Sequence, residues 1–169
     1  MKALILNGEE KDGLSLKHIS KSIKEELRTN DFEVNELLLK EKEIADCIGC
    51  FKCWVKTPGV CIIDDYGREV AAQVINSDLL VFLTPLIFGS YSYQLKKALD
   101  RILPLISPYF KKINGDYFFK YIYLFVVFSV FFFSGTGEFF GFNINGIPVP
   151  LSVVGIIIKV ELCDLAKSL

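Results

Sequence analysis

Histidine is almost absent from this chain, because His18 is the only one among 169 residues. A nucleophile activated by a neighbouring imidazole, as in Cys–His or Ser–His hydrolases, therefore has a single candidate partner. His18 falls within a predicted helix, remote from the loops expected to bind a ligand, and we interpret it as a solvated helix residue. The sequence indicates no catalytic acid, base or nucleophile and disfavours hydrolysis.

An excess of basic residues is also lacking. The chain has 19 lysines and arginines against 20 aspartates and glutamates, and its pI is about 5.9. Nucleic-acid binding usually shows as a basic patch, so we expect no nucleic-acid partner. The length is typical of one domain, and we treat residues 1–169 as a single domain with a cysteine-rich loop at 46–65.

Charge is scarcest late in the chain, where residues 121–158 contain only Glu138. An apolar stretch of this kind requires a membrane span to be weighed. The Ser134–Gly137 break leaves the uncharged run from Tyr121 shorter than the ~20 residues that a spanning helix needs. We predict no membrane span and keep a non-catalytic, membrane-associated protein as an alternative, which recovery without detergent would contradict.

Cysteine, by contrast, is concentrated. Four of the five cysteines fall within fifteen residues as C-x2-C-x2-C-x7-C, namely Cys47, Cys50, Cys53 and Cys61. No signal peptide is recognisable at Met1, where a strand is predicted, so we expect a reducing, cytoplasmic setting. Clustered cysteines in such a setting indicate metal or redox chemistry.

The cysteine spacing has four interpretations. Four thiolates satisfy a [4Fe–4S] cluster, which the spacing favours. Structural zinc sites also use four sulfurs, but usually on two separated knuckles. One pair could form a disulfide, or the thiols could pack as small apolar groups with Phe51 and Trp54. These alternatives stay open, and the isolated Cys163 is interpreted as a packed thiol.

Hydrophobic patterning predicts alternating strands and helices. The apolar run Ala3–Asn7 suits a strand buried on both faces, and Leu16, Ile19, Ile23 and Leu27 recur on one helical face. Such alternation is typical of a parallel α/β sheet. The predicted strands are 3–7, 32–39, 78–84, 121–130 and 153–160, and the predicted helices are 15–28, 66–77 and 94–103. We predict a flavodoxin-like three-layer sandwich with five parallel strands in the order 2-1-3-4-5.

The C-terminal part is atypical for this plan. Parallel strands need a crossover, usually a helix, yet residues 134–150 carry glycines and prolines that disfavour one. We expect one face of the sheet near its edge to lack a cover. Exposed apolar surface of that kind usually marks an interface.

Ligands of such sheets bind at the carboxyl ends of strands 1 and 3, where the strand order reverses. The loops there are 8–15 and 84–92. Backbone N–H groups at the first helix attract a phosphate, with support from Lys11 and Ser15, whereas the carboxylate of Glu9 and its acidic neighbours would repel it. An ordinary surface loop is an equally good interpretation. The apolar second loop would pack against a flat ring, or it would simply cover the sheet end.

Four segments together resemble the NADPH-dependent FMN reductase / iron–sulfur flavoprotein family. They are MKALILNG, DCIGCFKCWVKTPGVCIIDDYGREV, SDLLVFLTPLIFGSYSYQLKKALDR and PYFKKING, and they span about the first 115 residues. The resemblance implies a flavodoxin-like fold, FMN at the strand ends and a homodimer or homotetramer. Carried over by position, the cofactor-binding residues would be Gly8, Lys11, Ser15, Thr84, Pro85, Leu86, Ile87, Phe88 and Gly89, and the cluster ligands would be Cys47, Cys50, Cys53 and Cys61.

One departure weakens the phosphate site. The family's usual Gly-Ser-Pro-Arg is replaced here by Gly8-Glu9-Glu10-Lys11. The leading hypothesis is an FMN-dependent oxidoreductase that accepts hydride from NAD(P)H and passes electrons to a flavin, quinone or protein acceptor. A [4Fe–4S] cluster, if held, would divide the electron pair into single steps. The alternative is a flavodoxin-type electron carrier without small-molecule turnover, which assays of NAD(P)H oxidation would separate.

Overall fold

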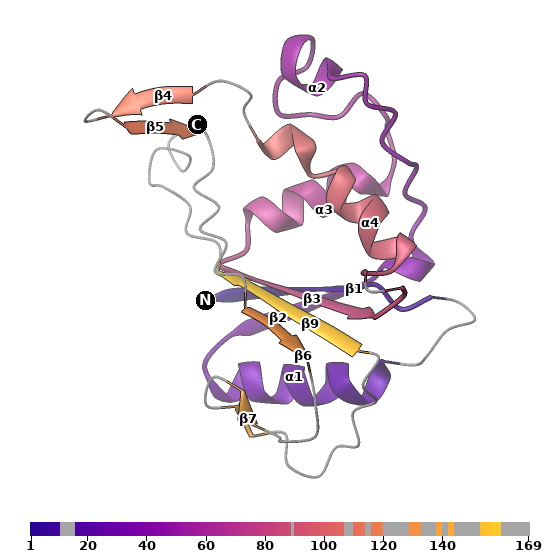
Figure 1. The fold of residues 1–169 in the computed structure, drawn as a ribbon, viewed down its shortest axis with the longest axis vertical. Helices are drawn as coiled ribbons and strands as arrows, with labels where there is room; N and C mark the ends of the chain where they lie inside the picture. Colours follow the sequence, from indigo (N-terminus) through magenta and orange to yellow (C-terminus); the bar gives the residue numbers. More distant parts are fainter. Residues whose placement is uncertain are drawn as a thin grey trace.

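A computed structural model describes residues 1–10, 16–88 and 90–106, and beyond them the backbone of the later strands. Alternating strands and helices make up the N-terminal two thirds, as Figure 1 shows. The elements of that part are β1 (Lys2–Asn7), α1 (Lys17–Thr29), β2 (Glu33–Leu38), η1 (Leu39–Glu41), α2 (Lys52–Val55), α3 (Tyr66–Ile75), β3 (Leu79–Pro85), α4 (Tyr93–Asp100) and η2 (Leu103–Leu105). The later strands are β4 (Phe110–Ile113), β5 (Asp116–Phe119), β6 (Ser129–Phe132), β7 (Glu138–Phe139), β8 (Phe142–Asn143) and β9 (Val153–Lys159).

The first three strands form the parallel sheet that the sequence predicts. β1 lies between β2 and β3, with Leu4 opposite Asn35 on one side and Leu80 on the other. Five consecutive residues of β1 are buried, because helices cover both faces of a parallel sheet. The α/β class and the order 2-1-3 of these strands are confirmed.

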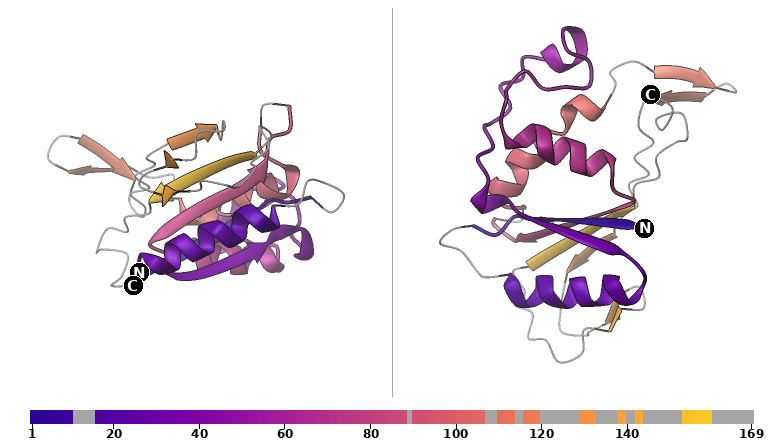
Figure 2. Two further views of the ribbon diagram at one scale, coloured as in Figure 1. Left: turned by 90° about the horizontal axis from the view of Figure 1, so that it is seen from below. Right: turned by 180° about the vertical axis from the view of Figure 1, so that it is seen from behind.

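Helices from opposite sides complete three layers. α1 packs on one face, where Ile19 and Leu27 contact Ile5 and Val81. α3 and α4 pack on the other face, where Val70, Val74, Leu95 and Ala98 meet Leu4, Leu6, Leu80 and Phe82. Both views in Figure 2 agree with this separation of α1 from α3 and α4. The chain therefore leaves β1 toward one face and β3 toward the other.

The predicted all-parallel, five-stranded order is wrong for the last two strands. β9 pairs antiparallel with β3, with Val81 opposite Ile157, and β6 pairs antiparallel with β9, so the order is β2-β1-β3-β9-β6. A parallel return would need a helical crossover, and the glycines and prolines of residues 134–150 disfavour one. An antiparallel return needs no such helix. The predicted strand 121–130 falls mainly outside the described residues.

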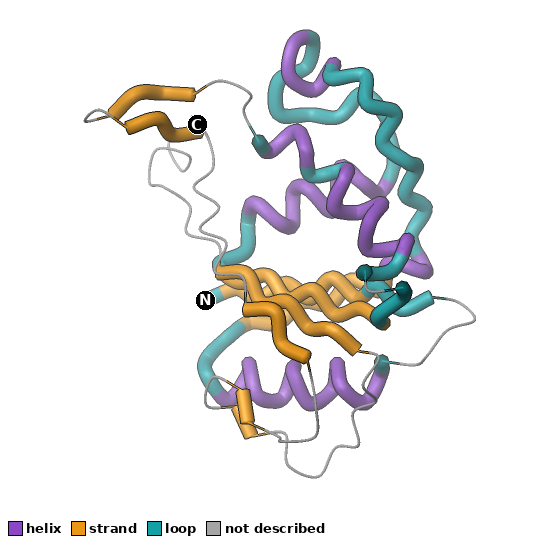
Figure 3. The backbone as a smooth tube through the Cα atoms, viewed as in Figure 1, coloured by secondary structure: helices purple, strands orange, loops and turns teal. Residues whose placement is uncertain are grey.

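The segment between η1 and α3 is almost entirely loop, as the tube in Figure 3 shows. Only the short α2 interrupts it. We call residues 46–65 the cysteine segment; it lies beyond α3 and α4, on the side of the sheet opposite α1 (Figure 1). Among the described residues, no helix combines the length and apolar character that a bilayer crossing requires.

Candidate functional site

The carboxyl ends of β1 and β3 lie side by side and open into loops that diverge. The loop after β1 leads to α1 on one face, and the loop after β3 leads to α4 on the other. This divergence is the point where parallel α/β sheets bind ligands. The structure thus brings together the two loops that the sequence singles out.

Gly8 contacts both the end of β3 and the residue that caps α4. Its N–H donates to Leu83 O at 2.7 Å, and its carbonyl accepts from the Ser92 hydroxyl at 2.6 Å. A Cβ at position 8 would lie 2.6 Å from Ser92 Oγ and 2.9 Å from Leu95 Cβ. Only glycine permits this approach. Both polar backbone groups of Gly8 are therefore committed to holding the loops together.

Thr84 and Pro85 form the buried end of β3. The Thr84 hydroxyl accepts the Ser92 N–H at 2.9 Å and donates to Pro85 O at 3.1 Å. The Ser92 hydroxyl also caps α4 by accepting the Leu95 N–H. Thr84 therefore shapes the loop from beneath. Ser92 was missed by the sequence reasoning, although a serine three residues before a helical leucine is an N-cap signal.

The outer part of the second loop is more accessible. Leu86 and Ile87 are half-buried, and Phe88 is fully exposed. Ile87 and Ser90 exchange backbone hydrogen bonds, which close a tight turn, and Phe88 has a φ of 48° within it. Such a left-handed conformation is uncommon for a bulky residue. The turn presents Phe88 outward, while Gly89 lies outside the described residues.

Glu9 turns inward, whereas a carboxylate in a loop usually faces water. It is buried, accepts the Leu16 N–H at 2.9 Å and pairs with Lys40 Nζ at 2.6 Å. Burial raises the pKa of Glu9, but the hydrogen bonds from Lys40 and Leu16 outweigh it and leave the pKa below its ordinary value. Glu9 is thus an internal anion at the start of α1. Lys11 and Ser15 lie outside the described residues.

Glu36 carries a second, half-buried carboxylate beneath the same loop. Its oxygens accept from Asn7 Nδ2, the Ser20 hydroxyl and Lys24 Nζ at 2.9, 2.6 and 2.7 Å. Burial raises the pKa of Glu36, but the hydrogen bonds from these three donors outweigh burial and leave the pKa below its ordinary value. The network joins β1, α1 and β2, so it fixes the base of the first loop.

The cysteine segment carries four free thiols. Cys53 is buried in α2, and Cys47, Cys50 and Cys61 are half-buried. Burial raises the pKa of the Cys53 thiol, and negative charge on Cys61, Cys47 and Cys50 raises it further. The other three thiols of the segment are therefore close enough to influence the ionisation of Cys53.

These thiols match the donor set of an iron–sulfur cluster, which takes four cysteines. Within the part of the chain that the structure describes, however, no three candidate ligands already converge as they would around a metal ion. Loading would therefore require the thiols to draw together. The left-handed backbone at Gly49 and Phe51 supplies sharp turns between the first three. The residues fit the group in chemistry and sequence spacing.

Aromatic side chains attach the cysteine segment to η2, which follows α4. The rings of Phe51 and Trp54 lie 5.0 Å apart, and Trp54 Nε1 donates to Leu103 O at 3.2 Å. At the other end of the segment, Arg68 Nε donates to Cys61 O at 2.9 Å. These contacts hold the backbone around the thiols.

Comparison with known proteins gives consistent matches. The model of the NADPH-dependent FMN reductase family matches residues 1–129. An iron-sulfur flavoprotein of Archaeoglobus fulgidus is 33% identical over 105 residues, which is 62% of this chain and 46% of that protein. One from Methanocaldococcus jannaschii is 37% identical over 73 residues, 43% of this chain and 37% of the relative. A third, from Methanosarcina thermophila, is 27% identical over 101 residues, which is 60% of this chain and 52% of that relative. The chain thus spans about half or less of the length of these relatives.

Proposed function

Because the chain belongs to the NADPH-dependent FMN reductase family, we propose that it binds FMN in the crevice beyond β1 and β3 and works as an FMN-dependent oxidoreductase. The observation that carries this proposal is the Ser92–Gly8 hydrogen bond of 2.6 Å. It locks the two loops together where their helices depart to opposite faces of the sheet. A crevice at that point is the usual ligand site of such sheets.

The second loop would hold the flavin ring. Phe88 is exposed and Leu86 and Ile87 are half-buried beside it, so they offer apolar surface, and backbone groups of the loop can meet the polar ring edge. Bound FMN would supply hydride acceptance and one-electron chemistry, and the protein would orient the ring and limit water access. Gly89 belongs to the same proposed set, while Thr84 and Pro85 support it from beneath.

The flavin phosphate would lie near the start of α1. Lys11 and Ser15 are the proposed residues there, and Gly8 supports the loop through its two backbone hydrogen bonds. Lys40 adds a cation whose Nζ contacts Glu9. The negative charge of the Glu9 carboxylate repels the phosphate dianion. The carboxylate also occupies the Leu16 N–H, which the phosphate could otherwise use. We therefore expect the phosphate to add less affinity than it does at a loop without this charge.

NAD(P)H is the proposed hydride donor, and a flavin, quinone or protein is the proposed acceptor. The family's name supports the nicotinamide. Three relatives named iron-sulfur flavoproteins support a further step of electron transfer. A homodimer or homotetramer stays a prediction from the resemblance.

Cys47, Cys50, Cys53 and Cys61 are the proposed ligands of a [4Fe–4S] cluster. A cluster accepts and releases single electrons, which suits it to work beside a two-electron flavin. The protein's part is to keep the four thiols on one anchored segment, on the face of the sheet that carries α4. Neutral packing or a disulfide is the competing use of the same thiols.

The test begins with protein purified without oxygen and titrated with FMN. We expect flavin binding, followed by oxidation of NADH or NADPH with a quinone or ferricyanide as acceptor. Failure to bind FMN would overturn the site. Binding without turnover of either nicotinamide would leave the electron-carrier alternative.

Iron and acid-labile sulfide, measured on the same protein, test the cluster. We expect Cys53→Ser to lose iron and Cys163→Ser, outside the four-cysteine motif, to retain it. Background iron in the unmodified protein that still binds flavin would contradict the cluster and leave a plain flavoprotein.

A further inference from the structure

Arg101 is a charged residue in an apolar place. It directly follows α4, and its side chain is fully buried. Arginine is seldom buried unless it is paired, because removing its charge from water is costly. Its partners therefore indicate what the residue does.

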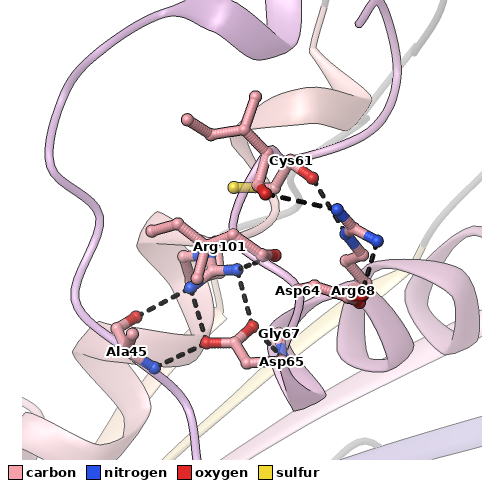
Figure 4. Close-up of polar contacts among 9 residues, drawn as sticks. Ala45, Cys61, Asp64, Asp65, Gly67, Arg68 and Arg101 are labelled. Atoms are coloured by element: carbon pink, nitrogen blue, oxygen red, sulfur yellow. Dashed lines mark hydrogen bonds and ion pairs between the residues drawn. The ribbon is translucent and has the colours of Figure 1, made fainter.

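The guanidinium of Arg101 contacts both ends of the cysteine segment, as Figure 4 shows. Nη1 donates to Ala45 O at 3.0 Å, just before the segment, and Nη2 donates to Ile63 O at 3.1 Å, near its end. The same two nitrogens contact the Asp65 carboxylate at 2.8 and 2.6 Å. One side chain thus clamps two backbone positions between which all four clustered cysteines lie.

Asp65 completes the clamp. Its carboxylate accepts the N–H groups of Ala45 and Gly67 at 2.8 and 2.9 Å in addition to the arginine fork. Burial raises the pKa of Asp65, but the Ala45 N–H, Arg101 and the Gly67 N–H together hold it below its ordinary value. Asp65 also caps α3. The pair therefore joins the two ends of the segment to α3 and α4 at once.

α4 connects this clamp with the flavin loops. At its start, Ser92 donates to Gly8 O at 2.6 Å. The Tyr93 hydroxyl donates to the Asp46 carboxylate at 2.8 Å, at the beginning of the cysteine segment. At its end stands Arg101. The start of α4 therefore contacts the proposed flavin crevice and the beginning of the cysteine segment, and Arg101 at its end contacts both ends of that segment.

We propose that Arg101, acting through Asp65, is a positioning residue that sets where the cysteine segment lies relative to the flavin loops. The inference rests on the proposed function for its purpose, since positioning serves electron transfer between the thiol-bound group and the flavin. The planar fork of arginine bonds a carboxylate in one geometry and leaves donors for the two carbonyls. A lysine ammonium has no such fork.

General stabilisation is a weaker explanation of the pair. A buried ion pair often adds little to stability compared with apolar residues of similar volume. In addition, Arg101 Nε has no hydrogen-bond partner among the described residues. If stability were the pair's only role, apolar residues of similar volume could take its place at little cost in stability. Apolar residues could not bond the carbonyls of Ala45 and Ile63, which lie on two separate chain segments.

Gly67 offers a variant that keeps both charges. A Cβ there would lie 3.0 Å from Arg101 Cζ and 3.0 Å from Asp65 Oδ1. Gly67→Ala should therefore displace the pair, although alanine favours the helix more than glycine does. Arg101→Met and the double variant Arg101→Met/Asp65→Asn remove the fork outright, and Arg101→Lys asks whether charge alone suffices.

Alkylation of the metal-free protein by iodoacetamide, resolved peptide by peptide, tests the proposal without flavin or cluster. We expect Cys53, which is 7% exposed, to react about tenfold faster in Arg101→Met and Gly67→Ala, because local opening releases the segment. Arg101→Lys should not restore protection. Lys24→Met is the matched control, since it breaks a partly buried pair with Glu36 beneath the other face of the sheet.

The outcomes separate cleanly. Unchanged Cys53 reactivity in both Arg101→Met and Gly67→Ala would overturn the proposal, and so would an equal increase in Lys24→Met at matched stability. After loading with iron and sulfide, we expect the Arg101 variants to bind less iron per flavin while FMN affinity is retained. If the unmodified protein takes up no iron, the proposed cluster fails, and the alkylation result still decides the role of Arg101.

Discussion

The Glu9 carboxylate lies 2.9 Å from the backbone nitrogen of Leu16 and occupies the N–H group at the start of α1. A free N–H at a helix start is a natural partner for a phosphate. In this chain an internal anion has taken the N–H of Leu16, the residue just before α1, and Lys40 balances its charge.

Glu9→Gln should tighten FMN binding about five- to tenfold, because one unit of like charge within roughly 4 Å of a phosphate costs about 1 kcal/mol in a watery environment. Riboflavin lacks the phosphate, so its affinity should stay the same. Fluorescence titration with both flavins measures the ratio. Equal changes for the two flavins would show that Glu9 acts on the fold and not on the phosphate.

Gly8→Ala should destabilise the protein by about 1–3 kcal/mol, as overpacking in a filled interior does. The added Cβ would meet Ser92 Oγ at 2.6 Å. Urea unfolding measures the loss, and FMN affinity should fall with it. Ser92→Ala has a cost of its own, because it removes the cap of α4 and the bond to Gly8 O. The cost of Gly8→Ala should nevertheless be smaller in a Ser92→Ala background, where the nearer atom is gone, and an equal cost in both backgrounds would contradict the close approach.

Phe88→Ala should leave stability within about 0.5 kcal/mol, because exposed side chains contribute little. Phe88 is fully exposed and lies outside both core clusters. If it packs on the flavin ring, FMN and riboflavin should both bind more weakly, by about 1 kcal/mol or slightly more. Val55→Ala, also at an exposed residue, is the control that should change neither quantity.

Stability should fall as the pH drops from about 5 to about 3. The pKa values of Glu9, Glu36 and Asp65 are all lowered in the fold, so the unfolded chain binds more protons in that range. Their contribution is complete above the unfolded pKa values and is lost below the folded ones. Urea midpoints across this range measure the slope.

Glu36→Gln should flatten that pH dependence and lower stability at neutral pH, since Glu36 accepts three hydrogen bonds. Glu25→Gln is the control, because its contact with Lys21 is exposed and 3.8 Å long. A slope in Glu36→Gln as steep as in the unmodified protein would place the acid sensitivity elsewhere.

Local patterning was sufficient to predict the first part of the fold. The apolar runs and helical stripes give β1, α1, β2, α3, β3 and α4 with ends shifted by no more than about three residues. The order 2-1-3 follows from the alternation itself. The antiparallel β9 could not be read in the same way, because its residues 153–158 are apolar throughout and carry no signal of strand direction.

The candidate site was only partly predictable. The sequence indicates which loops meet, and the structure brings Gly8 and Ser92 together there. It does not indicate that Glu9 turns inward to Leu16, since a carboxylate in a loop usually faces water. Arg101 was missed for the same reason. Arg101 follows Asp100 at the charged end of a helix and precedes the apolar run from Ile102 to Ile106, and its partners are distant in sequence.

Trp54, whose indole N–H reaches the carbonyl of Leu103, is the chain's single tryptophan. The sequence therefore carries one indole, which can be excited at wavelengths where its seven tyrosines do not absorb, and it lies on the cysteine segment beside the buried Cys53. Its emission and anisotropy report on that segment alone, without a label and without interference from a second indole. Movement of the segment during metal loading or flavin reduction can be followed in real time in the unmodified chain.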